Sequence, residues 1–183
     1  MALKTTNIDD RGVGFDRGRT EQQKGVSPAA VRFPLLPALL LGLGLGGLFD
    51  GVVLHQLLQW HHMLSSWYPV DSIANLRINT LWDGIFHGFT YVLIVTGVFL
   101  LWRAAEDHRF PWTRLQFAGA LLCGWGVFNV VEGLVDHILL GIHHVNETVP
   151  RAAWVWWDVG FLLAGGMMIV AGLWLMRPRP AIP

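Results

Sequence analysis

Four long apolar segments constrain what this chain can fold into. Crossing the hydrocarbon core of a bilayer takes about 20 residues of helix, and each segment is long enough to do so. Hydrophobic residues make up 53% of the chain and aromatic residues 12%, which is too apolar for an ordinary soluble domain. The sequence therefore predicts an all-α integral membrane four-helix bundle, with spans at about residues 33–59, 79–102, 112–140 and 153–176.

Ionisable side chains gather at one end of these predicted spans. Seven of the eight histidines lie there, together with several Asp and Glu residues. Charged groups inside a membrane are costly and by default indicate a functional site. Because no Lys or Arg lies in that half of any span, the buried acids need a proton, a metal ion or an imidazolium group to neutralise them.

The pattern predicts a metal site, because His and carboxylate side chains from separate helices would meet at one depth. Asp83 and His87 are one helical turn apart and can address one ion. At about 100° per residue, Glu132, Asp136 and His143 fall on one stripe of the third span. The predicted ligands are Asp50, His55, His61, His62, Asp83, His87, Glu132, Asp136, His137, His143 and His144. The side chains predicted to support them through hydrogen bonds are Asn79, Asn129 and Asp158.

The residue types narrow the choice of ion. A mixed set of imidazoles and carboxylates suits iron or copper, and zinc less well, in a site of one or two ions. A single cysteine, Cys123, excludes a thiolate-rich zinc or iron–sulfur site. Haem is not expected, because carboxylates crowd the imidazoles where a porphyrin needs apolar walls.

Basic residues set the predicted orientation. Of the 13 Lys and Arg residues, only Arg77 and Arg151 lie at the histidine-rich end of the spans. The positive-inside rule then places both termini in the cytoplasm and the metal site on the periplasmic side of a bacterial inner membrane. Residues 1–32 are predicted to form a disordered cytoplasmic tail, residues 33–176 the transmembrane domain, and residues 177–183 a short cytoplasmic tail.

Several short strings resemble a bacterial family of predicted four-span membrane proteins of unknown function. The resemblance covers about residues 33–176. It implies the four-helix fold and marks the His, Asp and Glu positions as the family's hallmark, but it implies no activity. Such proteins are further associated with assembly factors of copper-containing cytochrome oxidases, which implies copper handling. The strings are Phe49-Asp50-Gly51, Gln59-Trp60-His61-His62, Asn79-Thr80-Leu81-Trp82-Asp83-Gly84, Glu132-Gly133, Asp136-His137, His143-His144-Val145 and Trp157-Asp158.

Three functions fit these observations. The first is a redox metalloenzyme with an outward-facing centre that acts on a small or lipophilic substrate. The second is a copper-binding or delivery protein for a respiratory oxidase, which the paired histidines favour and the lack of Met or Cys clusters disfavours. The third is a zinc-dependent membrane hydrolase, in which a metal-bound water attacks a carbonyl.

The expected partner is the lipid bilayer, with a second copy of the chain or a respiratory complex as further candidates. The formal net charge is zero, which gives no reason to expect a nucleic acid.

Overall fold

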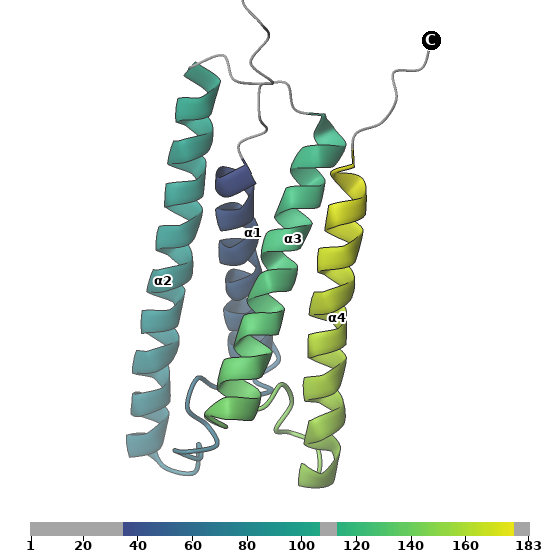
Figure 1. The fold of residues 1–183 in the computed structure, drawn as a ribbon. Helices are drawn as coiled ribbons and strands as arrows, with labels where there is room; N and C mark the ends of the chain where they lie inside the picture. Colours follow the sequence, from purple (N-terminus) through teal and green to yellow (C-terminus); the bar gives the residue numbers. More distant parts are fainter. Residues whose placement is uncertain (1–34, 107–112, 178–183) are drawn as a thin grey trace, which may run out of the picture. The chain divides into compact units, whose positions relative to one another are not determined.

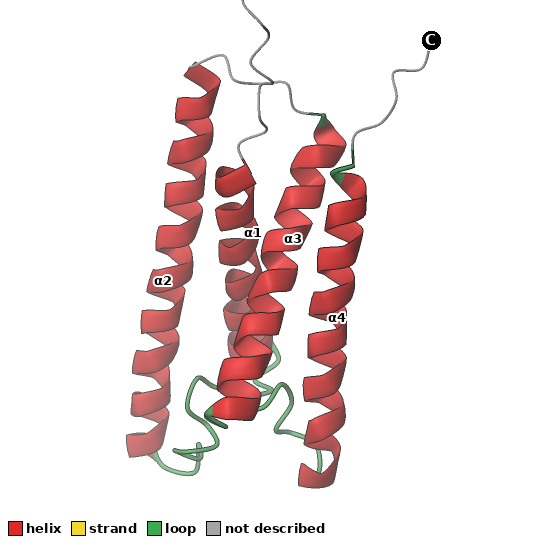
Figure 2. Ribbon diagram, viewed as in Figure 1, coloured by secondary structure: helices red, strands yellow, loops and turns green. Residues whose placement is uncertain are grey.

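The computed structural model describes residues 35–106 and 113–177, and within these ranges every regular element is a helix (Figure 1). In chain order the elements are α1 (Leu35–Phe49), η1 (Asp50–Leu57), α2 (Ile73–Glu106), α3 (Arg114–Glu132), η2 (Gly133–Leu139), η3 (Arg151–Ala153) and α4 (Trp154–Leu175). The segments η1 and η2 are π-helical continuations of α1 and α3, and η3 is a 3-10 turn before α4. The predicted all-helical fold is confirmed, and Figure 2 shows loops between the helices but no strand in the described part.

Four helical segments are long and apolar enough to cross a membrane: Leu35–Leu57, Ile73–Glu106, Arg114–Leu139 and Arg151–Leu175. The largest difference from the predicted spans is at α2, which begins at Ile73 and not at Asn79. Ser72 accounts for the early start, because its side-chain oxygen accepts a hydrogen bond of 3.2 Å from the backbone N–H of Asn75. Such a bond satisfies one of the free N–H groups at a helix start.

Helices α1 and α3 form the centre of the bundle. α1 packs against α2 and α3, and α3 packs against α4, so the helices lie in the order α2, α1, α3, α4 (Figure 1). The central pair approaches most closely where Gly42 meets Gly124. A methyl group on Gly42 would lie 2.1 Å from the carbonyl oxygen of Leu121, and one on Gly124 would lie 2.3 Å from that of Leu39. Glycine permits this backbone contact between membrane helices.

The flanking helices present large apolar side chains outward. Phe89 and Tyr91 on α2 are 61% and 67% exposed, and Leu163 and Val170 on α4 are 63% and 67% exposed. A soluble protein rarely exposes so much apolar surface, whereas a lipid bilayer covers it. The four helices therefore fit a four-span membrane protein.

The second helical hairpin, α3 to α4, repeats the contacts of the first, α1 to α2. A methyl group on Gly44 would meet the carbonyl oxygen of Thr90, and one on Gly126 would meet the carbonyl oxygen of Gly165. Other residues in these contacts correspond in the same way. Residues of α1 correspond to residues of α3 at a constant sequence offset, Gly42 to Gly124 and Leu41 to Cys123. Residues of α2 correspond to residues of α4 at a second constant offset, Ile94 to Ile169 and Gly97 to Gly172. Since α1 and α3 run in the same direction, an approximate two-fold axis along the helices relates the two hairpins.

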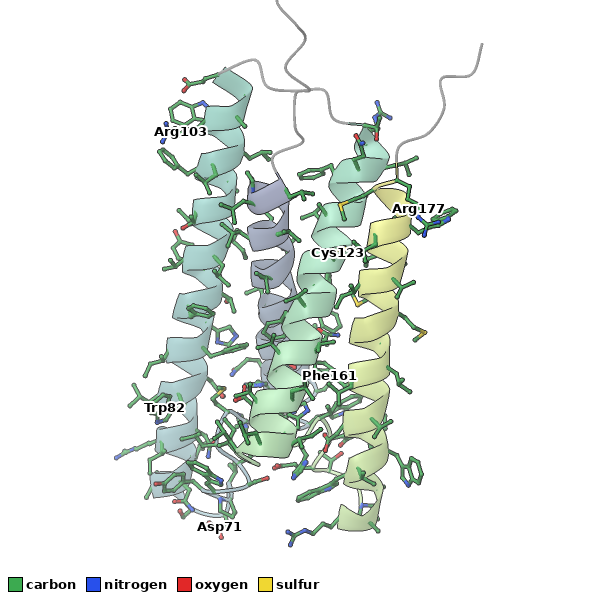
Figure 3. The ribbon with its side chains drawn as sticks, viewed as in Figure 1. Asp71, Trp82, Arg103, Cys123, Phe161 and Arg177 are labelled. Atoms are coloured by element: carbon green, nitrogen blue, oxygen red, sulfur yellow. The ribbon has the colours of Figure 1, made fainter. Side chains whose placement is uncertain are left out.

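The loops that carry the two His-His pairs, His61-His62 and His143-His144, lie at one end of the helices. Figure 3 shows Asp71 at that end, and Arg103 and Arg177 at the other. The predicted tail at residues 1–32 and all of the predicted tail at 177–183 except Arg177 lie outside the described residues. The side of the membrane on which each end lies stays a prediction.

Cysteine labelling tests the predicted orientation. In intact cells, a membrane-impermeant maleimide should react with Val70→Cys and Thr148→Cys, because both positions are exposed in the histidine-rich loops. Native Cys123 is 4% exposed and should stay silent, and Glu106→Cys at the opposite end should react only after lysis. The reverse pattern would place the histidine-rich end in the cytoplasm.

A second prediction concerns the contact between α1 and α3. Gly124→Leu should lower the melting temperature in detergent, because overpacking a close contact costs about 1–3 kcal/mol. Gly166→Leu on α4 is the matched control, since no atom lies within 4 Å of the position where its side chain would begin. Equal melting temperatures for the two variants would contradict the packing described for Gly42 and Gly124.

Candidate metal site

The candidate metal site begins where α1 and α3 turn into π-helices. The backbone N–H of Leu58 donates to the carbonyl of Val53, and that of Leu140 donates to Val135, both at 2.8 Å. Because π-helical bonds join residues five apart, residues with this spacing lie on one face. Asp50 and His55 have this spacing, and their Oδ2 and Nε2 atoms are 3.0 Å apart.

The chain then reverses direction in both hairpins. Gln59 and Gly141 each have a positive φ, of 51° and 57°. Gly141 adopts this conformation without strain, whereas it is uncommon for a residue with a side chain such as Gln59. The reversals fold the following His-His pairs back under the helix ends. Backbone hydrogen bonds join the two loops, from Ser66 to Ile142 at 3.0 Å and from Glu147 to Trp60 at 2.9 Å.

His61 and His143 meet on the approximate two-fold axis. Their rings stack with centroids 4.5 Å apart and planes 6° apart. Each ring is fixed by the opposite loop: Nδ1 of His61 donates to the carbonyl of Val145 at 2.9 Å, and Nδ1 of His143 donates to that of Met63 at 3.0 Å. This crossed pair of bonds leaves both Nε2 atoms without a hydrogen bond to any described residue.

His55 and His137 flank the stacked pair. Nδ1 of His55 donates to Oδ1 of Asp83 at 2.9 Å, and Nδ1 of His137 lies 3.4 Å from Oδ1 of Asp158. A phenylalanine ring lies against each imidazole: Phe86 stacks on His55 with planes 17° apart, and Phe161 is tilted by 48° from His137. A histidine that gives Nδ1–H to an oxygen acceptor keeps a lone pair on Nε2, which is the form that binds a metal.

Six side chains converge in this region, and none is more than 5% exposed. Ligand atoms lie within 4.8 Å of one another in three sets: His55 with His61 and His143; Glu132 with His137 and His143; and Asp50 with His61 and Glu132. Each hairpin supplies one carboxylate and two imidazoles, at equivalent positions. The arrangement can bind metal ions between the two repeats.

The two carboxylates outside this set hold imidazoles in place. Oδ2 of Asp83 accepts from Nδ1 of His62 at 2.7 Å, and Oδ2 of Asp158 accepts from Nδ1 of His144 at 2.6 Å. The remaining oxygens accept backbone N–H groups, from Met63 at 2.8 Å and from Val145 at 3.0 Å. Asp83 therefore anchors a loop and two imidazoles, and its role as a ligand beside His87 stays a prediction.

The other predicted residues lie around the cluster. His87 and Asp136 are half-buried and fall outside the three converging sets, although Nε2 of His87 is buried close to Gly51. Asn79 fastens the first loop, since its side chain bonds to the backbone of Leu64 and Tyr68. Its hydrogen bonds support the loop and not a ligand directly.

An outer cavity reaches the cluster from the histidine-rich end. It has a volume of about 650 Å³, and His61, His62 and His144 line it together with Glu147 and Arg151. The side chains of His62 and His144 are 16% and 24% exposed, so they lie at the boundary between the cavity and the buried cluster. Water and ions have a route to the site through this cavity.

His143 lies outside the spans and is fully buried beside other imidazoles. Burial lowers its pKa well below the ordinary value, and the nearby His61, His137 and His55 lower it further. The ring is therefore neutral at physiological pH, as a metal ligand must be.

Sequence reasoning missed the internal repeat, although the printed chain contains it. The acid, the following glycine and the three histidines of Asp50–His62 recur at the same spacing in Glu132–His144. The predicted α-helical stripe grouped Glu132 with Asp136 and His143. Glu132 and His143 do converge, together with His137, whereas Asp136 lies outside the converging sets, because η2 is π-helical and the chain reverses at Gly141.

Comparison with known proteins identifies the family of the chain. A family model described as predicted membrane protein (DUF2243) matches residues 37–179, which include every residue of the candidate site. No curated protein and no solved structure matches the chain. The resemblance drawn from the short strings is confirmed, and the chain belongs to the DUF2243 family of predicted membrane proteins.

Proposed function

We propose that this protein is a membrane metalloprotein whose buried cluster binds a pair of transition-metal ions, iron or copper, in a redox-active centre. One observation carries the proposal: the Nε2 atoms of His61 and His143 are buried without a hydrogen bond among the described residues, while carbonyl oxygens accept hydrogen bonds from their Nδ1 atoms. Proteins orient metal-binding histidines in this way. A purely structural cluster would leave these nitrogens unpaired in a low-dielectric region at a large cost.

The repeat favours two ions over one, because each hairpin contributes a set of one carboxylate and two imidazoles that can bind an ion. Sites with two imidazoles and one carboxylate commonly bind non-haem iron and leave positions open for a substrate. The two triads would be Asp50 with His55 and His61, and Glu132 with His137 and His143.

Burial favours a resident ion over an ion in transit. All four imidazoles are at most 3% exposed, so an ion bound there would be slow to pass to a partner protein. Haem does not suit the geometry, because the rings of His61 and His143 stack directly on each other and leave no space between them for a porphyrin. We further propose that the site opens to the periplasm through the outer cavity.

Metal analysis of paired variants tests the proposal. His55→Ala and His137→Ala should each lower the bound metal to about half or less, because each removes a ligand from one triad. The measurement is elemental analysis of protein purified in detergent without a chelator. Absorption spectra of the same samples should lack the intense haem band.

His108→Ala is the control for those variants, since this histidine lies in the sequence between α2 and α3 and is not one of the predicted ligands. Its metal content should equal that of the unmodified protein. Equal metal content in all three variants would rule out the cluster as the metal site.

Charge balance gives a second test. The carboxylates of Asp50 and Glu132 belong to one converging set, and without cations they oppose each other in a buried region. Glu132→Gln should weaken metal binding yet raise the melting temperature of the metal-free protein. A lower melting temperature for the metal-free variant would mean that the Glu132 carboxylate stabilises the fold by itself, against this account.

A further inference from the structure

The two faces of the repeated bundle differ at a few positions next to the candidate metal site. Gly46 in α1 is equivalent to Phe128 in α3, and Gly160 in α4 is equivalent to Ile85 in α2. One face therefore has two glycines where the other face has two large side chains. The exchange removes two large side chains from one face only. The aromatic and polar residues differ as well: Trp125, Trp156 and Asn129 on the opened face correspond to Leu43, Leu81 and Gly47.

The opened face contains a cavity of about 450 Å³ between α1, α3 and α4. This volume lies within the range of small-molecule sites. Aromatic rings form much of its wall, including Phe49, Trp125, Trp157 and Phe161. Trp156, which also lines it, is 74% exposed on the lipid-facing surface. The cavity therefore opens sideways toward the bilayer, and Trp60 lies between it and the outer cavity beside His62 and His144, because this residue lines both.

Two polar side chains interrupt the apolar wall. One is Asp50, which is 2% exposed and is also part of the candidate metal site. The other is Asn129, which is 7% exposed and whose side-chain amide makes no hydrogen bond within the described residues. An amide without a partner is costly in an apolar wall. A ligand with a hydrogen-bonding group would satisfy it.

We propose that this cavity binds a flat, lipid-soluble aromatic molecule that carries a hydroxyl group. The aromatic walls suit a ring system, the lateral opening suits a molecule that partitions into the bilayer, and Asn129 and Asp50 suit the hydroxyl. Since Asp50 also faces His55 and His61, the hydroxyl end of the ligand lies beside the metal cluster. That the ligand is a substrate of the metal centre rests on the function proposed above, whereas its binding does not.

Ligand retention by the protein in lipid nanodiscs tests this proposal, with 1-naphthol and naphthalene as probes. The unmodified protein should bind 1-naphthol saturably above the background of empty nanodiscs, and naphthalene more weakly. Gly160→Ile introduces the residue type found at the equivalent position, Ile85, and no atom lies within 4 Å of the place where the new side chain would begin. This variant should lower the affinity for 1-naphthol at least about tenfold, a change of about 1.4 kcal/mol. Asn129→Ala should bring the affinity for 1-naphthol closer to that for naphthalene, because only Asp50 is then left to bond the hydroxyl.

The matched control is Gly166→Ile, which makes the same substitution in α4 outside this cavity and should bind like the unmodified protein. Equal binding of the two probes would mean a slot for lipid acyl chains and would overturn the proposal, as would normal binding by Gly160→Ile. Metal content is measured in the same samples. Selective naphthol binding without metal would support the cavity and refute the metal site; metal without naphthol binding would refute the cavity alone.

Discussion

The structure depends on how four buried imidazoles are held at one end of a membrane bundle. Each ring must satisfy one nitrogen within the protein, and for three rings the acceptor is a carbonyl or carboxylate oxygen. The opposite nitrogens of these rings point into a common region that also contains the oxygens of Asp50 and Glu132. Because unpaired polar atoms are costly when buried, this end of the bundle is stable only if something binds there or protons rearrange.

Internal duplication explains how one short chain builds such a site. Each hairpin alone carries one carboxylate and two imidazoles, and each fixes the stacked histidine of the other through a loop carbonyl. Neither half can therefore orient its own central histidine. The glycine contact between α1 and α3 brings the two halves together, and the π-helical ends turn the ligands toward the axis. Small departures from the repeat, such as Gly46 at the position equivalent to Phe128, then open a cavity on one face of the bundle.

The sequence predicted the spans and the collection of polar residues at one end, because apolar length and the cost of buried charge are visible residue by residue. It could not assign each side chain its place. The spacing of Asp83 and His87 did not predict that Asp83 accepts hydrogen bonds from His55, His62 and the backbone of Met63. A periodicity of about 100° per residue holds only for an α-helix, whereas His55 and His137 lie in π-helices and His61 and His143 lie in loops. Comparison of the chain with itself would have revealed the repeat and with it the pairing of the ligands.

X-ray absorption spectroscopy of the purified protein, at the edge of whichever metal it contains, tests the central claim most directly. The account predicts nitrogen and oxygen neighbours at about 2.1 Å, with the outer scattering pattern of imidazole rings. It also predicts a second metal at about 3.5–4 Å, as in other two-metal sites. A metal surrounded only by oxygen, without imidazole scattering, would contradict it, because such an ion would be bound outside the four-histidine cluster.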